Sequence, residues 1–500
     1  MKFVITFLLF AITTTSFSQK LSESRLEFDL KDGYTGESLV SFEKDGFLVY
    51  SKSSEPTKAG REWKFDAYDS ELDLETSVNI TIPKSMSIAN SSKDDENLYM
   101  IFKDKKSDFI FITLNRKSMK INRNEGELPS KIRLRNMRVL GGKAYFAATY
   151  KKALHLFNID VESGKTSIEK LEIDGFSSKK TKLLKFQLLE DDKEAFVFLS
   201  VKTERKENEI YVKKIDEDGS VGSFYHLTKD IEENVIDISA SKLNDDTYIY
   251  SGTYSTKRIT MSEGLIFMEL EGDDLNYVNS YSFLDLDEFL SYLPEKKQAK
   301  IEKKKKKKEG KGKELILSYL IAGHNLIPHA DGFTYIGEAY YPTYRTEYYT
   351  SYVNGQAVTR SRQVFDGYQY THAVIAKFDQ DGELMWDRCF EMWPYYKPYY
   401  AKRFIEVLEN EDDEVKMVFM NSGRIKSMSV DGDGDILQDE ESDALETGDE
   451  DDKIKRSYGK VDYWYDNYFL AYGSQKIKNK DETDKKKRKR KVFFISKIEF

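Results

Sequence analysis

The chain has 500 residues, of which 39% are hydrophobic and 14% aromatic. This supply of apolar side chains is sufficient for a folded core and excludes a globally disordered chain. A formal net charge of −9 argues against nucleic acid as a partner, because nucleic-acid-binding proteins present a net basic face. The single cysteine, Cys389, excludes an intrachain disulfide, and its position in an expected strand favours a small buried residue over a reactive thiol.

Residues 1–18 have the pattern of a signal peptide. A short basic region precedes an apolar run over residues 3–12, and Ser16 and Ser18 fit the −3 and −1 positions of a cleavage site before Gln19. The run is too short to span a membrane, and no cysteine follows it for a lipid anchor. The sequence therefore predicts a soluble exported protein of the periplasm or extracellular space, with no transmembrane segment after cleavage.

A repeating pattern of four short strands follows. A strand over residues 24–30 has no partner nearby, and the first unit then has strands over 38–43, 47–52, 62–68 and 77–82, separated by Gly or Asp residues. The second strand of this unit is the easiest to follow along the chain. Its eight copies cover residues 47–52, 98–103, 144–150, 195–201, 247–254, 333–341, 415–421 and 468–473.

The units also share a tight turn. Residues 372–386 read HAVIAKFDQDGELMW, which is two alternating stretches joined by the turn at 379–382, and similar turns occur at 216–219 and 431–434. Alternation is the period of a strand with one buried face. The Gly after two Asp residues supplies the positive φ of a hairpin turn. A hairpin that recurs in this way indicates a repeat fold.

Eight units of four antiparallel strands, with little helix, predict an all-β fold in which residues 19–500 form a single β-propeller. Eight blades is the expected number and seven the alternative. A pair of sandwich domains is a further alternative, although no linker divides the chain. The last unit ends one strand short while residues 24–30 are in surplus, so we expect residues 24–30 to pair antiparallel with residues 492–498 and close the ring.

Two insertions interrupt the repeat. Within residues 285–314 we expect a short helix over 286–293, ended by Pro294, and then a solvated loop that contains six consecutive lysines at 303–308. The second insertion, residues 342–367, separates two strands of the sixth blade and is dense in tyrosine.

The tyrosine-rich region is the best candidate for a binding site. Tyr and Trp offer a large contact area with a polar tip, and with Arg they are enriched at binding surfaces. Core packing accounts for residues such as Tyr335, but not for an excursion of about 25 residues that adds nothing to the blade. The candidate binding residues are Tyr341, Tyr344, Arg345, Tyr348, Tyr349, Tyr352, Arg360, Arg362, Tyr368, Trp393, Tyr395 and Tyr396.

Signals for metals and catalysis are weaker. Four acids alternate as in a calcium loop: Asp431, Asp433, Asp435 and Asp439. The positions that such a loop reserves for Gly and a bidentate Glu hold Ile436 and Ser442, which favours a plain hairpin turn over calcium. His324, His329 and His372 would form a metal site only if the sixth blade brought them together, and structural histidines are the commoner outcome. No catalytic motif is present, so no catalytic residue is assigned.

By its repeats, its export signal and the turns at 216–219, 379–382 and 431–434, the chain resembles exported β-propellers of the cell envelope. These include the eight-bladed propeller of the outer-membrane barrel-assembly machine, which unlike this chain is a lipoprotein, and propeller-like periplasmic subunits of secretion translocons. The resemblance implies a non-catalytic scaffold that binds a protein partner such as an outer-membrane protein.

The alternative function is a carbohydrate- or small-ligand-binding propeller, or a hydrolase, with its site at the axial channel. An axial funnel lined by converging acids and aromatic residues would favour this alternative. An aromatic, arginine-bearing surface away from the axis would favour the scaffold.

Overall fold

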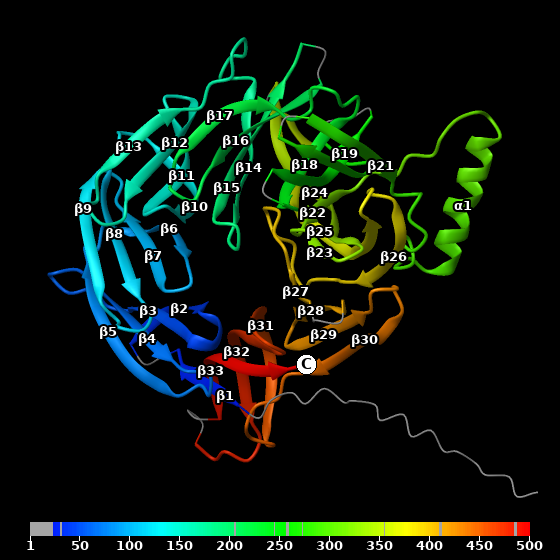
Figure 1. Ribbon diagram of the computed structural model, residues 1–500. Coiled ribbons are helices and arrows are strands. Elements are labelled where there is room, and N and C mark those ends of the chain that lie inside the picture. The colour runs from blue at the N-terminus through cyan, green and yellow to red at the C-terminus, as the bar shows by residue number, and fades with distance from the viewer. Residues whose placement is uncertain are drawn as a thin grey trace, which may run out of the picture.

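The computed structural model describes residues 24–30, 33–204, 207–244, 246–256, 260–272, 274–354, 356–409, 413–484 and 488–500. The expected signal peptide, residues 1–18, lies outside these ranges. The described chain forms eight antiparallel sheets arranged as the blades of a ring, with one α-helix outside it (Figure 1). The all-β, eight-bladed propeller is therefore confirmed, and the alternatives of seven blades or two sandwiches are wrong. None of the described helices is long and apolar enough to cross a membrane.

Blades 1 to 4 each contain four consecutive strands. Blade 1 consists of β2 (Tyr34–Ser41), β3 (Phe47–Ser53), β4 (Arg61–Tyr68) and β5 (Leu74–Ile82), with the 3-10 helix η1 (Glu43–Asp45). Blade 2 consists of β6 (Ser87–Lys93), β7 (Asn97–Lys103), β8 (Asp108–Asn115) and β9 (Ile121–Glu127). Blade 3 consists of β10 (Arg133–Leu140), β11 (Lys143–Tyr150), β12 (Ala153–Asp160) and β13 (Thr166–Lys170). Blade 4 consists of β14 (Thr181–Leu189), β15 (Glu194–Lys202), β16 (Asn208–Ile215) and β17 (Val221–His226).

Blades 5 to 8 complete the ring. Blade 5 consists of β18 (Asn234–Lys242), β19 (Thr247–Ser255), β20 (Gly264–Glu271) and β21 (Asp274–Ser282). Blade 6 consists of β22 (Leu320–Gly323), β23 (Ile327–His329), β24 (Gly332–Val353), β25 (Gln356–Asp379) and β26 (Leu384–Glu391). Blade 7 consists of β27 (Ile405–Glu409), β28 (Val415–Asn421), β29 (Arg424–Val430) and β30 (Ile436–Ala444). Blade 8 consists of β31 (Asp452–Tyr465), β32 (Tyr468–Asn479), β33 (Lys489–Glu499) and β1 (Arg25–Asp29).

The strand order within a blade fixes what faces the axis and what faces solvent. The first strand of each blade lies nearest the axis and the last strand lies at the rim (Figure 1). All eight copies of the expected second strand are second strands of their blades, from β3 to β32. These strands read as nearly continuous apolar runs because both of their faces are covered by neighbouring blades, as the five consecutive buried residues of β7 show.

The core consists of eight apolar clusters, each of which joins two consecutive blades. Between blades 1 and 2, for example, Trp63 meets Phe102 edge to face with ring centroids 5.2 Å apart. Between blades 8 and 1, Trp464 packs on Phe47 at 5.7 Å in the same way. The ring is therefore held by a closed series of side-chain layers between blades, in which no blade has a core of its own.

Closure of the ring follows the expected pairing. β1 pairs antiparallel with β33 as the outermost strand of blade 8, with a register from Arg25 opposite Ser496 to Asp29 opposite Val492. The Arg25 guanidinium donates to Gln475 Oε1 at 2.6 Å and lies over the Phe494 ring at 4.7 Å. The two ends of the chain are thus joined in one sheet, as the surplus strand predicts.

The helix of the first insertion begins after Pro294, so the expected helix over residues 286–293 is wrong. Residues 286–293 form turns, and Leu286 and Phe289 are buried between blades 5 and 6. The helix is α1 (Glu295–Glu309), which begins directly after Pro294 and contains all six lysines expected in a loop. Pro fits the start of a helix, Lys and Glu are good helix formers, and lysines are favourable at a helix C-terminus. The apolar spacing of residues 286–293 predicts a helix wrongly, because these apolar residues pack into the core as turns. The actual helix is exposed to solvent and needs no apolar face.

We expect ring closure through β1 to be required for a soluble protein. Two recombinant chains, one beginning at Ser24 and the other at Lys31, differ only by this strand. Without it the outer edge of β33 is unpaired and the packing of Phe28 on Tyr68 and Phe493 is lost, so the shorter chain should aggregate. The measurement is the soluble fraction after expression and its size distribution. Equal solubility of the two chains would contradict a structural role for the closing strand.

Candidate functional site

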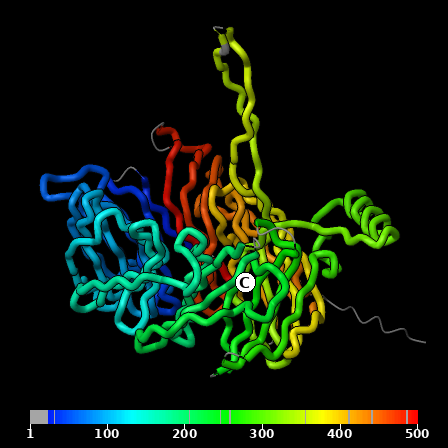
Figure 2. The backbone as a smooth tube through the Cα atoms, turned by 90° about the horizontal axis from the view of Figure 1, so that it is seen from above, coloured from blue at the N-terminus to red at the C-terminus, as the bar shows by residue number. Residues whose placement is uncertain are grey.

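The tyrosine-rich insertion continues two strands of blade 6 beyond the ring. β24 and β25 pair from Gly332 opposite Asp379 to Val353 opposite Gln356, and their outer part projects from the propeller (Figure 2). We call residues 344–365 the arm. The register shifts twice where the arm leaves the blade, between Ala339 and Tyr340 and between Thr343 and Tyr344, and such bulges redirect a strand pair. The insertion is thus a strand pair that continues β24 and β25 of the blade.

The register gives the arm two chemically different faces, because directly paired residues point to the same side of a two-stranded sheet. The uncharged face has only aromatic, hydroxyl, amide and alanine side chains: Tyr344, Thr346, Tyr348, Thr350, Tyr352, Ala357, Thr359, Ser361, Gln363 and Phe365. The charged face has three arginines and one glutamate: Arg345, Glu347, Tyr349, Ser351, Val358, Arg360, Arg362 and Val364.

Contacts within each face agree with this division. On the charged face, Glu347 forms ion pairs with Arg345 at 2.8 Å and Arg362 at 3.0 Å, and these hold the pKa of Glu347 below its usual value. On the uncharged face, Tyr348 and Tyr352 are each 75% exposed. Exposed aromatic rings aligned along one face, with no charge beside them, offer apolar contact area that the chain itself leaves uncovered.

The base of the arm is covered by the segment that joins blade 6 to blade 7, residues 392–404. The Phe365 ring lies 5.9 Å from Tyr399, Lys397 pairs with Asp366 at 3.4 Å, and the Tyr368 amide donates to the Pro398 carbonyl at 2.8 Å. This packing continues the exposed aromatic surface from the arm onto the ring. The exposed aromatic residues of the base are Tyr341, Trp393, Tyr395, Tyr396, Tyr399 and Tyr400.

The sequence-predicted binding residues divide between these two parts. Seven lie on the arm: Tyr344, Arg345, Tyr348, Tyr349, Tyr352, Arg360 and Arg362. Tyr341, Trp393, Tyr395 and Tyr396 lie at the base, and Tyr368 is partly buried under Phe365 with ring centroids 5.0 Å apart. Tyr399 and Tyr400 are also exposed at the base and were not among the predicted residues, although they repeat the Pro-Tyr-Tyr pattern of residues 394–396. Their role in binding stays a prediction.

His324, His329 and His372, which the sequence offers as a possible metal site, do not form one cluster among the described residues. His324 Nε2 is 3.0 Å from Glu338, a fully buried carboxylate that also accepts the amide N–H groups of Phe404 and Ile405. His372 is fully buried, and its ring stacks on Tyr292 at 4.2 Å. The third, His329, faces two carboxylates of blade 7.

Three acids of the possible calcium loop, Asp431, Asp433 and Asp435, belong to a tight turn, and Asp439 lies in β30. Asp431 Oδ1 accepts the backbone N–H groups of Asp433 at 3.0 Å and Asp435 at 2.8 Å, and Gly434 has φ +83°. The Asp431 carboxylate is therefore engaged by the turn itself, which agrees with the interpretation of these residues as a hairpin turn. Calcium at Asp431, Asp433, Asp435 and Asp439 stays an untested prediction.

The first strands around the axis border a cavity of about 410 Å³, which is lined in part by Lys185 of β14, Asp237 of β18, Tyr340 and Arg403. Burial lowers the pKa of Lys185, Asp237 raises it, and nearby Arg403 and Arg138 lower it further. Charges of both signs thus meet at the inner strands, with three cations close enough to repel one another.

Comparison with known proteins adds little to this geometry. No family model matches the chain, and no curated protein matches it in sequence. Solved structures that resemble it include the WD40 domain of SCAP from fission yeast, at 10% identity and TM-score 0.39 over 95% of this chain and 98% of that domain. The β-propeller domain of the Trilobed protease from Pyrococcus furiosus aligns at 10% identity and TM-score 0.28 over 83% of this chain and 94% of that one. A prolyl endopeptidase aligns at 9% identity and TM-score 0.39 over 90% of this chain, which spans 54% of that enzyme.

We expect His372 to make stability depend on pH. Burial lowers its pKa from 6.5 to about 3, so between these values the unfolded chain binds a proton that the folded chain does not. Stability should therefore fall as the pH falls below 6.5. Between pH 7 and pH 5 the wild type should lose about 2 kcal/mol more unfolding free energy than His372→Phe, which keeps the ring stacking.

The measurement is urea unfolding of both proteins at the two pH values. Burial raises the pKa of Glu406 to about 7, which gives the opposite dependence, but Glu406 is present in both proteins and cancels in the comparison. An equal loss of stability in the two proteins would show that His372 is protonated in the fold.

Proposed function

We propose that the protein is a non-catalytic interaction propeller of the cell envelope, which binds a protein partner through the arm and its aromatic base. The arm is the observation that carries the proposal. A two-stranded hairpin is at best marginally stable alone in water, and this one projects from the ring without a third strand beside it. A structure that adds nothing to the core, yet exposes aligned tyrosines, fits a role in contact with another molecule.

The edges of the arm support the same proposal. β22 and β23 pair with β24 only up to Tyr340, and β26 pairs with β25 only from His372 onward. Within the described chain, the outer edges of the arm therefore have no β-partner. Unpaired edges accept an added strand from another protein, and exposed tyrosines on one face would supply side-chain contacts for it. The proposed partner is an envelope protein, such as an outer-membrane protein, because the signal-peptide pattern predicts export.

Excision of the arm should abolish partner binding and leave the ring intact. Residues 346–363 are replaced by Asn-Gly, which joins the paired residues Arg345 and Val364 by a two-residue turn. The tagged protein is cross-linked in intact envelopes of its own cell and its partners are quantified by mass spectrometry. We expect an unchanged Tm and loss of the main cross-linked partner.

Two variants with an intact arm separate its faces. Substitution of Tyr344, Tyr348 and Tyr352 by Ser removes the rings of the uncharged face, and substitution of Arg345, Arg360 and Arg362 by Gln is the control on the other face. The tyrosine variant should bind at least about tenfold more weakly, since each buried Tyr at an interface contributes on the order of 1–2 kcal/mol. An unchanged set of partners in both variants and in the excised form would place binding elsewhere.

A second candidate function is binding of a small anionic ligand, such as a carboxylate or phosphate, at the inner strands. The cavity beside Lys185 and Arg403 carries this candidate, because three basic residues, Lys185, Lys402 and Arg403, line it together with one acidic residue, Asp237. We expect a panel of small carboxylates and phosphates to raise the Tm of the wild type, and Arg403→Gln to lose the increase. If no anion raises the Tm of the wild type, this candidate is wrong.

A further inference from the structure

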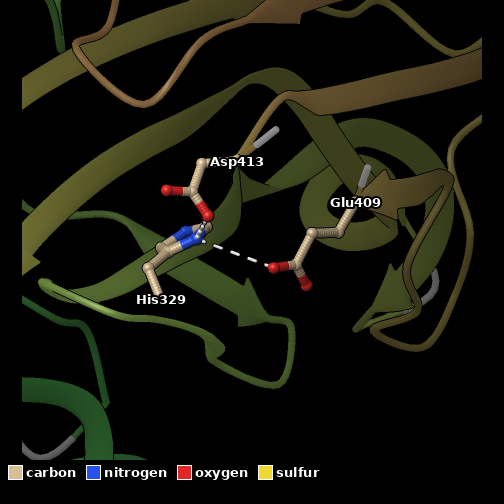
Figure 3. Close-up of side chains that lie close together, drawn as sticks. All are labelled: His329, Glu409 and Asp413. Atoms are coloured by element: carbon tan, nitrogen blue, oxygen red, sulfur yellow. Dashed lines mark hydrogen bonds and ion pairs between the residues drawn. The ribbon is translucent and has the colours of Figure 1, made fainter. Parts of the chain in front are cut away.

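Three side chains from neighbouring blades converge at one point of the ring. His329 ends β23 in blade 6, Glu409 ends β27 in blade 7, and Asp413 lies just before β28 (Figure 3). Their nearest nitrogen and oxygen atoms all lie within 4.8 Å of one another. His329 Nδ1 is 3.1 Å from Asp413 Oδ1 and 3.6 Å from Glu409 Oε1.

The two separations from the imidazole nitrogen are close to those of donor atoms that share one metal ion. Nitrogen and oxygen ligands bind Zn²⁺ at about 2.1 Å, which places neighbouring donors roughly 3.0 Å apart in an octahedral site and roughly 3.4 Å apart in a tetrahedral one. The two distances from the imidazole nitrogen therefore need changes of only a few tenths of an ångström.

The histidine is oriented as a metal-binding histidine is. His329 Nε2 is 2.8 Å from the hydroxyl of Thr334, which is buried, and the His329 side chain is only 1% exposed. In the tautomer with its proton on Nε2, the imidazole donates to this hydroxyl and the lone pair of Nδ1 faces the two carboxylates, as a metal ligand requires. In the other tautomer Nδ1–H donates to Asp413 Oδ1, so a metal bound at Nδ1 would select the tautomer with the proton on Nε2.

The two carboxylates are partly exposed, with 38% of the Glu409 side chain and 45% of the Asp413 side chain accessible to solvent. Lys377 is close, but its Nζ is engaged by Asp331 at 2.8 Å and by the Gly432 carbonyl at 3.0 Å. In the described part of the chain, neither Glu409 nor Asp413 forms an ion pair with a lysine or arginine.

We propose that His329, Glu409 and Asp413 form a binding site for a divalent transition metal of the zinc class, which joins blade 6 to blade 7. One imidazole and two carboxylates suit Zn²⁺ better than Ca²⁺, which prefers a full set of oxygen ligands. Three protein ligands leave a coordination position for water, and Glu409 borders a cavity of about 360 Å³ from which water can enter.

The test uses the full-length, tag-free protein after treatment with a chelator. We expect calorimetric titration with ZnCl₂ to show one site of micromolar or tighter Kd, and a hundredfold excess of Zn²⁺ over Kd to raise the Tm by at least about 2 °C. Glu409→Gln and Asp413→Asn, which keep the side-chain size, should each weaken binding at least about tenfold. Asp433→Asn, an exposed acid outside the cluster, is the matched control and should bind as the wild type does.

A second measurement identifies the nitrogen ligand. Co²⁺ bound to the wild type should show visible d–d absorption that changes when His329 is replaced by Gln, while Asp433→Asn leaves the spectrum unaltered. The proposal is overturned if the wild type binds no Zn²⁺ at millimolar concentration, or if Glu409→Gln and Asp413→Asn bind as tightly as the control. A calcium titration in which only Asp433→Asn loses binding would place the cation in the 431–435 turn instead.

Discussion

The structure depends on packing between blades around a closed ring. Each apolar cluster takes residues from two blades, so removal of a blade would expose both faces against which it packs. No disulfide can brace the ring, because the sequence has a single cysteine. The pairing of β1 with β33 joins the two ends of the described chain in one sheet, and the Trp464–Phe47 contact packs the last blade against the first.

This arrangement allows the rim and the ends of the strands to carry additional segments. The outermost strands carry little of the core, as the five exposed residues of β13 show. Helix α1 has no buried residue, and the arm extends two strands whose inner halves already satisfy the blade. Insertions at such places do not disturb the apolar clusters between blades. A binding surface built there therefore has little effect on the stability of the fold.

Features that core packing requires can be predicted from the sequence. Features that core packing does not require cannot be predicted in this way. The second strands are visible because burial on both faces requires apolar runs such as residues 98–102. Ring closure follows from counting strands, because an unmatched edge is unfavourable. The arm lacks the apolar–polar alternation by which a strand is predicted, because its two faces differ in charge rather than in hydrophobicity. Helix α1 lacks the apolar spacing of a packed helix, because its exposed face is made of lysines. Nothing in the sequence relates His329 to Asp413, which lie 84 residues apart and meet only through the contact of two blades.

The arm and the interface between blades 6 and 7 are mechanically connected. β24 carries Thr334, which orients His329, near one end and the exposed tyrosines near the other. A partner that pulls on the arm therefore loads blade 6. Apolar packing alone resists this poorly, because hydrophobic contact has no preferred direction and allows layers to slide. Directional contacts resist sliding, and several sets cross this interface. In the first, Glu338 accepts the N–H groups of Phe404 and Ile405, and in the second, His329 faces Glu409 and Asp413. In another, Lys377 and Trp386 donate to the Gly432 carbonyl. A metal ion at the second set would strengthen the boundary that the arm loads most directly.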